Sequence, residues 1–306
     1  MPTTQRRSLT LAASLFLVSS TLLACGDDSG TGASGGAGGE SSQGGSGSGG
    51  DSSAGGASAC ALAADTTPSG VENPDGCALL DRDTSSCQSA REALGLTGFW
   101  LNFSCRVTLS VANGVVTASS DGQPDYASNY FPVDDGCHED FTGRTQNPNW
   151  IEAFDLSVDI PTTTDEGGGD MTGAVVGLAA NGVAIFGNFA APGDDIYKEA
   201  ETFDRCGGHP QMAGQYHYHA EPYALSYEDS RFVGVLRDGY PVYGRYDEDG
   251  SLPTLDADGG HLGTTPDSPD QPVYHYHVHE ETSQTPGTAG QTEWFITTGT
   301  YHGTPL

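Results

Sequence analysis

The histidines of this chain recur in two copies of one pattern. Seven of the nine histidines lie in or beside a Gly-Gly-His sequence that is followed by Tyr-His-Tyr-His. In the first copy residues 207–209 precede residues 216–219, and in the second residues 259–261 precede residues 274–277. Alternate side chains of a β-strand point to opposite faces, so the two imidazoles of each Tyr-His-Tyr-His share one face. Together with a third histidine from a turn, they offer three nitrogen ligands, which suit zinc, copper, iron or nickel.

The predicted metal ligands therefore come from both copies. They are His209, His217, His219, His261, His275, His277 and His279, the last of which extends the second histidine face by one position. The spacing leaves open whether the copies make two sites or one site shared across a pseudo-twofold axis. The alternative to metal binding is a structural network in which the imidazoles donate hydrogen bonds to carboxylates and carbonyls.

Carboxylates and phenols near the motifs are candidates for orienting the ligand imidazoles from a second shell. They are Asp204, Asp256, Glu221, Glu280, Tyr216, Tyr218, Tyr274 and Tyr276. Asp204 and Asp256 are at least as well suited to turns, and the tyrosines to packing in the core on the opposite face of the strand. Outside the two copies, His138 and His302 are expected to be structural.

The duplication extends upstream of the histidines. Residues 176–187 resemble residues 233–244, and each stretch contains a turn signal between apolar runs, Asn181-Gly182 in one and Asp238-Gly239 in the other. Such pairs, like Asn113-Gly114 after a strand expected at residues 99–111, are typical of hairpin turns, and we expect type I′ in the two copies. The predicted repeated units span about residues 176–222 and 233–280.

Helical periodicity is scarce, with residues 86–94 and 195–202 as its best cases. Short strand-like segments separated by turn residues prevail from residue 98 onward. This pattern predicts an all-β single domain, sandwich or barrel-like, with an internal duplication and few short helices.

The N-terminus has the composition of an export signal. Two arginines precede an apolar run over residues 9–23, and a small residue precedes Cys25. This pattern is typical of a lipoprotein signal peptide over residues 1–25, with a lipid attached to Cys25. The alternatives are an ordinary signal peptide and an uncleaved anchor, but the apolar run is short for a membrane span of ~20 residues. Residues 26–59 are almost all Gly, Ser, Ala and Asp, which predicts a disordered linker.

Cysteine content and charge limit the location and the partners. If Cys25 carries a lipid, six cysteines remain, an even number that predicts three disulfides in an exported chain, with their pairing left open. Three of these cysteines lie in residues 60–97, a predicted Cys-rich extension before a domain over residues 98–306. The formal net charge of −30 argues against nucleic acid as a partner. The predicted location is the cell envelope, with contact to a membrane through the lipid anchor.

Several motifs together resemble the YHYH domain family. They are Gly-Gln-Tyr-His-Tyr-His at 214–219, Asp-Gly-Tyr-Pro-Val-Tyr-Gly at 238–244, Leu-Asp-x-x-Gly-Gly-His at 255–261 and the terminal Tyr-His-Gly-Thr-Pro at 301–305. The resemblance covers roughly residues 98–306. It implies no particular reaction.

Three functions are compatible with these residues. The preferred hypothesis is a cell-envelope lipoprotein that holds copper or zinc in its histidine motifs, and the scarcity of methionine near them argues against cuprous copper. The runner-up is a metal-dependent hydrolytic or oxidative enzyme on an unknown extracellular substrate, with Glu221 or Glu280 as general base. The third is a metal-free interaction or glycan-binding module. The sequence carries no serine-hydrolase elbow, zincin helix, P-loop or dinucleotide fingerprint, so the question of catalysis stays open.

Overall fold

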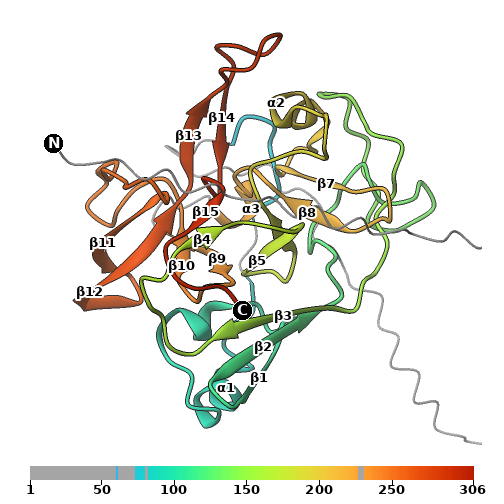
Figure 1. Ribbon diagram of the computed structural model, residues 1–306. Helices are drawn as coiled ribbons and strands as arrows, with labels where there is room; N and C mark the ends of the chain where they lie inside the picture. The colour runs from blue at the N-terminus through green and yellow to red at the C-terminus, as the bar shows by residue number, and fades with distance from the viewer. Residues whose placement is uncertain (1–59, 61–72, 80–81, 227–230) are drawn as a thin grey trace, which may run out of the picture. The chain divides into compact units, whose positions relative to one another are not determined.

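The computed structural model describes residues 60, 73–79, 82–226 and 231–306 (Figure 1). Strands predominate in this part of the chain, which confirms the predicted all-β class, and the sheets form an open, sandwich-like arrangement without a closed barrel among the described residues. The predicted lipoprotein signal and linker, residues 1–59, lie outside the described residues. Within the described ranges, no helix is both long enough and apolar enough to cross a membrane.

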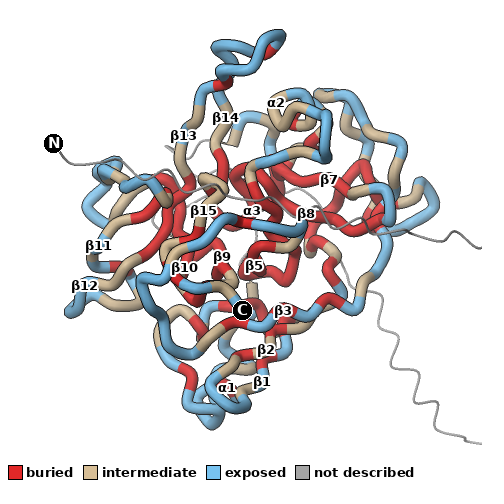
Figure 2. The backbone as a smooth tube through the Cα atoms, in the orientation of Figure 1, coloured by how far each residue is buried: buried red, intermediate tan, exposed pale blue. Residues whose placement is uncertain are grey.

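Both histidine motifs belong to one eight-stranded sheet with the order β11-β12-β10-β9-β5-β6-β8-β7. Its strands are β5 (Val175–Ala179), β6 (Ala184–Phe186), β7 (Gly208–Pro210), β8 (Tyr216–Tyr218), β9 (Phe232–Leu236), β10 (Pro241–Tyr243), β11 (Gly260–Thr265) and β12 (Ser268–His277). The central strands of this sheet are buried, as the red segments of Figure 2 show.

Smaller sheets and short helices surround this sheet. The other strands are β1 (Thr108–Ala112), β2 (Val115–Ser120) and β3 (Leu156–Pro161) in one sheet, and the pairs β13 (His279–Thr282) with β14 (Thr292–Phe295) and β15 (Thr300–Tyr301) with β4 (Gly169–Asp170). The helices are α1 (Gln88–Ala93), α2 (Ile196–Glu199) and α3 (Tyr223–Ser226), with the 3-10 turns η1 (Gly98–Asn102) and η2 (Ala200–Thr202). The two predicted helical segments are thus confirmed, as α1 and as α2 with η2.

The duplicated units are related by a pseudo-twofold axis, which is visible in the strand order. β5 to β8 form the first unit and β9 to β12 the second, and the units meet where β5 pairs antiparallel with β9. At the centre of this pair Leu178 lies opposite Val235, its equivalent in the other copy. Each unit continues outward through a hairpin, a parallel strand and an antiparallel edge strand. The histidine motifs therefore lie toward opposite edges of the sheet, as two sites rather than one shared site.

Two glycines allow the central strands to pair so closely. A Cβ on Gly177 would lie 2.5 Å from the carbonyl oxygen of Val235, and a Cβ on Gly234 would lie 2.5 Å from that of Leu178. Both clashes are with backbone, which has little freedom to move within a packed sheet. Glycine at these two equivalent positions is therefore a requirement of the interface between the repeats.

The predicted strand at residues 99–111 is wrong in its first part. Residues Gly98–Asn102 form η1, and β1 begins only at Thr108. The aromatic rings explain the difference, because Phe99 and Phe103 both pack against Phe232, with ring centroids 5.5 and 5.1 Å apart. In an extended strand these two side chains would share a face but lie about 13 Å apart, too far for both to pack on one ring, whereas the tight turn brings them together.

The hairpin turns differ in type. Asn113 and Gly114 both have positive φ, 52° and 80°, as a type I′ turn requires. At the two repeated hairpins only the glycine is left-handed, with φ of 90° at Gly182 and 92° at Gly239, so the type I′ prediction is wrong there. The preceding Asn181 and Asp238 are buried instead, and their side chains anchor tyrosines of the histidine strands.

Among the described residues three disulfides are present, as the cysteine count predicts, and the structure assigns their pairing. They join Cys60 to Cys137, Cys77 to Cys206 and Cys87 to Cys105, with Cα–Cα distances of 5.6, 4.9 and 5.5 Å. All three connect the Cys-rich extension, residues 60–97, to the region that follows it. Disulfides of this number indicate an exported protein, because reducing compartments do not maintain them.

Candidate metal centres

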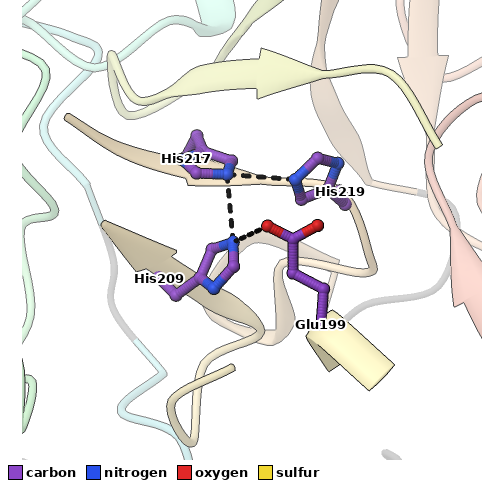
Figure 3. A group of neighbouring side chains, drawn as sticks. All are labelled: Glu199, His209, His217 and His219. Carbon is purple, nitrogen blue, oxygen red and sulfur yellow. Dashed lines mark hydrogen bonds and ion pairs between the residues drawn. The ribbon is translucent and has the colours of Figure 1, made fainter. Parts of the chain in front are cut away.

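The first histidine copy converges on one point. Nε2 of His217 on β8 lies 3.1 Å from Nε2 of His209 on β7 and 3.0 Å from Nε2 of His219, at the end of β8 (Figure 3). Glu199, at the end of α2, places a carboxylate oxygen 3.5 Å from Nε2 of His209. The three histidines are only 1–3% exposed. We call these four residues the first centre, and all their ligand atoms lie within 4.8 Å of one another.

The second copy builds the same arrangement at the other edge of the sheet. Nε2 of His261 on β11 lies 3.1 Å from Nε2 of His275 and 3.2 Å from Nε2 of His277, both on β12. Oδ1 of Asp247 lies 3.3, 3.8 and 3.5 Å from the Nε2 atoms of His261, His275 and His277. We call these four residues the second centre. Each centre thus offers three imidazoles and one carboxylate, a set that could hold a metal ion.

Backbone carbonyls determine which ring nitrogen carries the proton in the first centre. Nδ1 of His217 lies 3.1 Å from the carbonyl oxygen of Gln215, and Nδ1 of His219 faces the carbonyl oxygen of Gly187. A carbonyl only accepts, so each Nδ1 must be the protonated donor. In a neutral imidazole Nε2 is then an acceptor with a free lone pair.

The second centre repeats both bonds at equivalent positions. Nδ1 of His275 donates to the carbonyl oxygen of Val273 at 3.0 Å, and Nδ1 of His277 donates to that of Gly244 at 2.7 Å. The strand conformation thus sets the same tautomer in both copies. All four strand histidines present Nε2 lone pairs to the interior of their centre.

Lone pairs that face one another at 3.0–3.2 Å repel unless a cation lies between them. A metal ion at 2.0–2.1 Å from four tetrahedral ligands would hold them about 3.3–3.4 Å apart. The observed Nε2–Nε2 distances of 3.0 to 3.2 Å are close to that value. Between His217 and His219, hydrogen bonding of the rings is a poor alternative, because the protons of both are already engaged at Nδ1.

Burial lowers the pKa of the enclosed imidazoles and so keeps them in the neutral form that binds metal; they are His209, His217, His219, His275 and His277. It lowers the pKa of His209 and His217 well below the usual value, and that of His219 and His277 to about 4. Burial also raises the pKa of Glu199 to about 7, helped by the nearby charge of Asp194. Oε2 of Glu199 is buried without a hydrogen-bond partner in the described part of the chain. The other oxygen, Oε1, is the one that faces His209.

The tyrosines of the first motif lie on the opposite face of β8, in the core, as predicted. The hydroxyl of Tyr216 donates to Asp204 at 2.7 Å, and the amide of Asn181 lies 3.1 Å from the hydroxyl of Tyr218. Asp204 also accepts from the backbone N–H of Cys206 and Gly208, so it closes the turn that precedes His209. Its action on the histidine is through the backbone, and its carboxylate does not reach the ring.

The second motif uses the equivalent residues. Tyr274 donates to Asp256, with oxygen distances of 3.0 and 3.1 Å, and Tyr276 donates to Asp238 at 2.5 Å. Asp256 accepts from the backbone N–H of Gly260, as Asp204 does from Gly208 in the first copy. In both copies, therefore, polar anchors on one face hold the strand so that the histidines point to the other.

The remaining predicted residues lie away from both centres. His279 begins β13, and its Nε2 lies 3.1 Å from Glu281 rather than in the second centre. Glu221 is buried in an ion pair with Arg245 and accepts from the hydroxyl of Ser226 at 2.7 Å. Glu280 is exposed on β13.

Sequence reasoning missed the two carboxylates, Glu199 and Asp247. Glu199 ends a short helix, whereas Asp247 lies in a turn closed by a bond from its backbone N–H to Ser251. The segments from carboxylate to histidine differ in length and sequence between the copies, so the repeat gives no signal for them. Only the position of an acidic residue upstream of each Gly-Gly-His could have pointed to them, and many acidic residues share that property.

The third histidine-containing group has a weaker geometry. His302 lies near Asp256 and Asp258, with its Nδ1 3.4 Å from Asp258. Its ring stacks on Tyr274 with centroids 3.6 Å apart. The ring contact with Tyr274 is compatible with the structural role expected for His302, which stays a prediction.

Comparison with known proteins gives one match. No significant match to a curated protein or to a solved structure was found. A family model described as YHYH protein matches residues 159–252. This stretch includes the whole first centre and Asp247 but ends before His261, and it is shorter than the region of resemblance expected from the motifs. Over these residues, the resemblance of the chain to the YHYH protein family is confirmed.

Proposed function

We propose that this protein is an exported, lipid-anchored protein of the cell envelope that binds two divalent transition-metal ions. One ion is held by His209, His217, His219 and Glu199 and the other by His261, His275, His277 and Asp247. The observation that carries the proposal is the convergence of Nε2 atoms at 3.0–3.2 Å in both copies, with His217, His219, His275 and His277 fixed in the metal-binding tautomer. The formal charge of −30 would favour the approach of cations.

The ligand set favours zinc over cupric copper. In the second centre the five distances among His261, His275, His277 and Asp247 given above range from 3.1 to 3.8 Å, close to the equal edges of a tetrahedron. Cupric copper prefers a square-planar site, in which the two diagonals are about 1.4 times as long as the edges. The similar distances in the second centre do not match that geometry. Zinc accepts tetrahedral nitrogen and oxygen ligands.

The test is metal analysis of the protein purified without a chelator and without a histidine tag. We expect two equivalents of metal in the wild type after loading with zinc, one in His217→Ala, one in His275→Ala, and none in the double variant. His138→Ala is the matched control, because His138 lies outside both centres and should leave the count at two. A wild-type protein that binds neither zinc nor copper would overturn the proposal.

The lipid anchor is tested separately. Replacing Cys25 by Ser should release the protein from the membrane fraction and abolish labelling by a fatty-acid probe. Retention of the label in this variant would refute the anchor without bearing on metal binding.

A further inference from the structure

The two centres share ligands but differ in what surrounds them. Because the two centres lie in repeated sequence, the residues on and next to the histidine strands of the first centre have equivalents in the second, and these pairs can be compared one by one. The side chain of His209 is 3% exposed, whereas that of its equivalent His261 is 20% exposed. The second centre is therefore the one in which a ligand histidine, His261, reaches solvent, while His275 and His277 are 1% exposed.

Aromatic rings pack more closely on the histidines of the first centre than on those of the second. Phe186 stacks on His217 with ring centroids 3.8 Å apart and an interplanar angle of 18°. Its equivalent Tyr243 meets His275 edge-on, at 5.4 Å and 87°. Phe203, which is 1% exposed, packs on both His209 and His219; the residue at its place in the second copy is the smaller, partly exposed Leu255.

A glycine removes a further part of the cover. In the first centre Gln211 lies two residues after His209, and Gln215 lies two residues before His217, so each shares the face of its histidine. The side-chain amides of the two glutamines are 3.3 Å apart. The residue equivalent to Gln211 is Gly263. A Cβ on Gly263 would come within 2.9 Å of Cε1 of His261 and 3.4 Å of its Nε2, so any side chain there would lie against the metal-binding edge of the ring.

The histidine at this opening is also held less firmly. Nδ1 of His209 lies 2.7 Å from the hydroxyl of Thr202. For Nδ1 of His261 no partner exists among the described residues, and Asp247 belongs to a partly exposed turn. His261 thus lacks the bond that holds His209, whereas the two carboxylates are similarly exposed, at 28% for Glu199 and 23% for Asp247.

We propose that a metal ion in the second centre binds a small exogenous donor ligand, whereas a metal ion in the first centre does not. The donor is water at rest, and small anions can replace this water. This inference rests on the proposed metal binding. Asp247 already offers a fourth protein ligand, so the donor would either displace this carboxylate or enter as a fifth ligand. Displacement would leave three histidines and an exchangeable position, the arrangement of catalytic zinc sites, whereas sites closed by four protein ligands are structural. The duplication would then have separated a structural copy from a reactive one.

The test uses cobalt as a spectroscopic substitute in proteins that retain a single centre. His217→Ala keeps the second centre and His275→Ala keeps the first, and both are titrated with azide after their cobalt content has been measured. We expect a saturable, reversible change in the visible spectrum of His217→Ala, and at least about tenfold weaker binding, or none, in His275→Ala. Equal responses in the two proteins, or no response in His217→Ala with cobalt bound, would overturn the inference.

A swap variant tests the structural cause. Gly263→Gln, made in the His217→Ala background, places the residue of the first copy over His261 and should weaken azide binding at least about tenfold while cobalt stays bound. If azide binds this variant as before, the glycine is not the cause of access and this part of the inference fails. Should the variant lose cobalt, the comparison of the two single-centre proteins still decides the inference. Absence of cobalt from every protein would instead refute the proposed metal binding itself.

Discussion

Thr202 controls the proton of one ligand in the first centre. Its hydroxyl lies 2.7 Å from the carbonyl oxygen of Glu199, to which it donates, and 2.7 Å from Nδ1 of His209. Since the hydroxyl proton is committed to the carbonyl, the hydroxyl oxygen accepts from Nδ1–H. This bond places the lone pair of His209 on Nε2, where the metal would bind.

Replacement of Thr202 by Val keeps the shape and removes the acceptor. His209 is 2% exposed, so water has little access to replace the bond, and the nearby amide nitrogen of Asn147, at 3.4 Å, is a donor that cannot accept from Nδ1–H. The variant must either leave a buried N–H unpaired, at a cost of about 1–3 kcal/mol, or move the proton to Nε2, where it blocks the metal. Loss of such a partner typically weakens metal affinity by about 10–100-fold.

The assay is a competitive titration of zinc against a chromophoric chelator. Thr202→Val is compared with its parent in the His275→Ala background, so that only the first centre reports. We expect zinc affinity to fall by about 10–100-fold, equivalent to about 1.4–2.8 kcal/mol. The same substitution in the His217→Ala background should leave the second centre unchanged. Affinity of the first centre within a factor of about two of its parent would refute the reasoning, because it lies well outside the expected range.

Two further predictions concern stability. In the metal-free protein, burial lowers the pKa of His219 and His277 from 6.5 to about 4. The unfolded chain then binds more protons than the folded chain between these values, so the free energy of unfolding should fall as pH drops from 6.5 toward 4, by roughly 3 kcal/mol per residue, as measured by urea denaturation. Second, Gly177→Ala should lower the free energy of unfolding by about 3 kcal/mol or more, because its Cβ would meet the carbonyl of Val235 at 2.5 Å.

Each of these predictions has its own control. His277→Gln should remove its share of the acid destabilisation, and a pH dependence identical to that of the parent would contradict the assignment. Gly136→Ala is the reference for Gly177→Ala, because no atom lies within 4 Å of a Cβ at Gly136 and its φ is not left-handed. Equal urea midpoints for the two glycine variants would show that the contact between the repeats is not the constraint we infer.

The sequence by itself determined the β-rich class, the duplication, the presence of three disulfides and the six histidines that gather in two centres. These properties follow from local rules: residues two apart on a strand share a face, and repeated sequence folds into repeated structure. The opposite face of each motif was equally predictable, because Tyr216 and Tyr218 alternate with the histidines of β8.

The tertiary structure decided what depends on contacts between distant segments. It separated the copies into two centres, because β5 and β9 pair at the pseudo-twofold axis and send the histidines to opposite edges. It supplied Glu199 and Asp247, which reach their centres from segments that differ between the copies, and it excluded His279, which lies on another strand pair. It also assigned the disulfide pairing and the tautomers, because these depend on which carbonyl or sulfur lies within reach after folding. Spacing along a chain fixes the face of a side chain, but only packing fixes its neighbours.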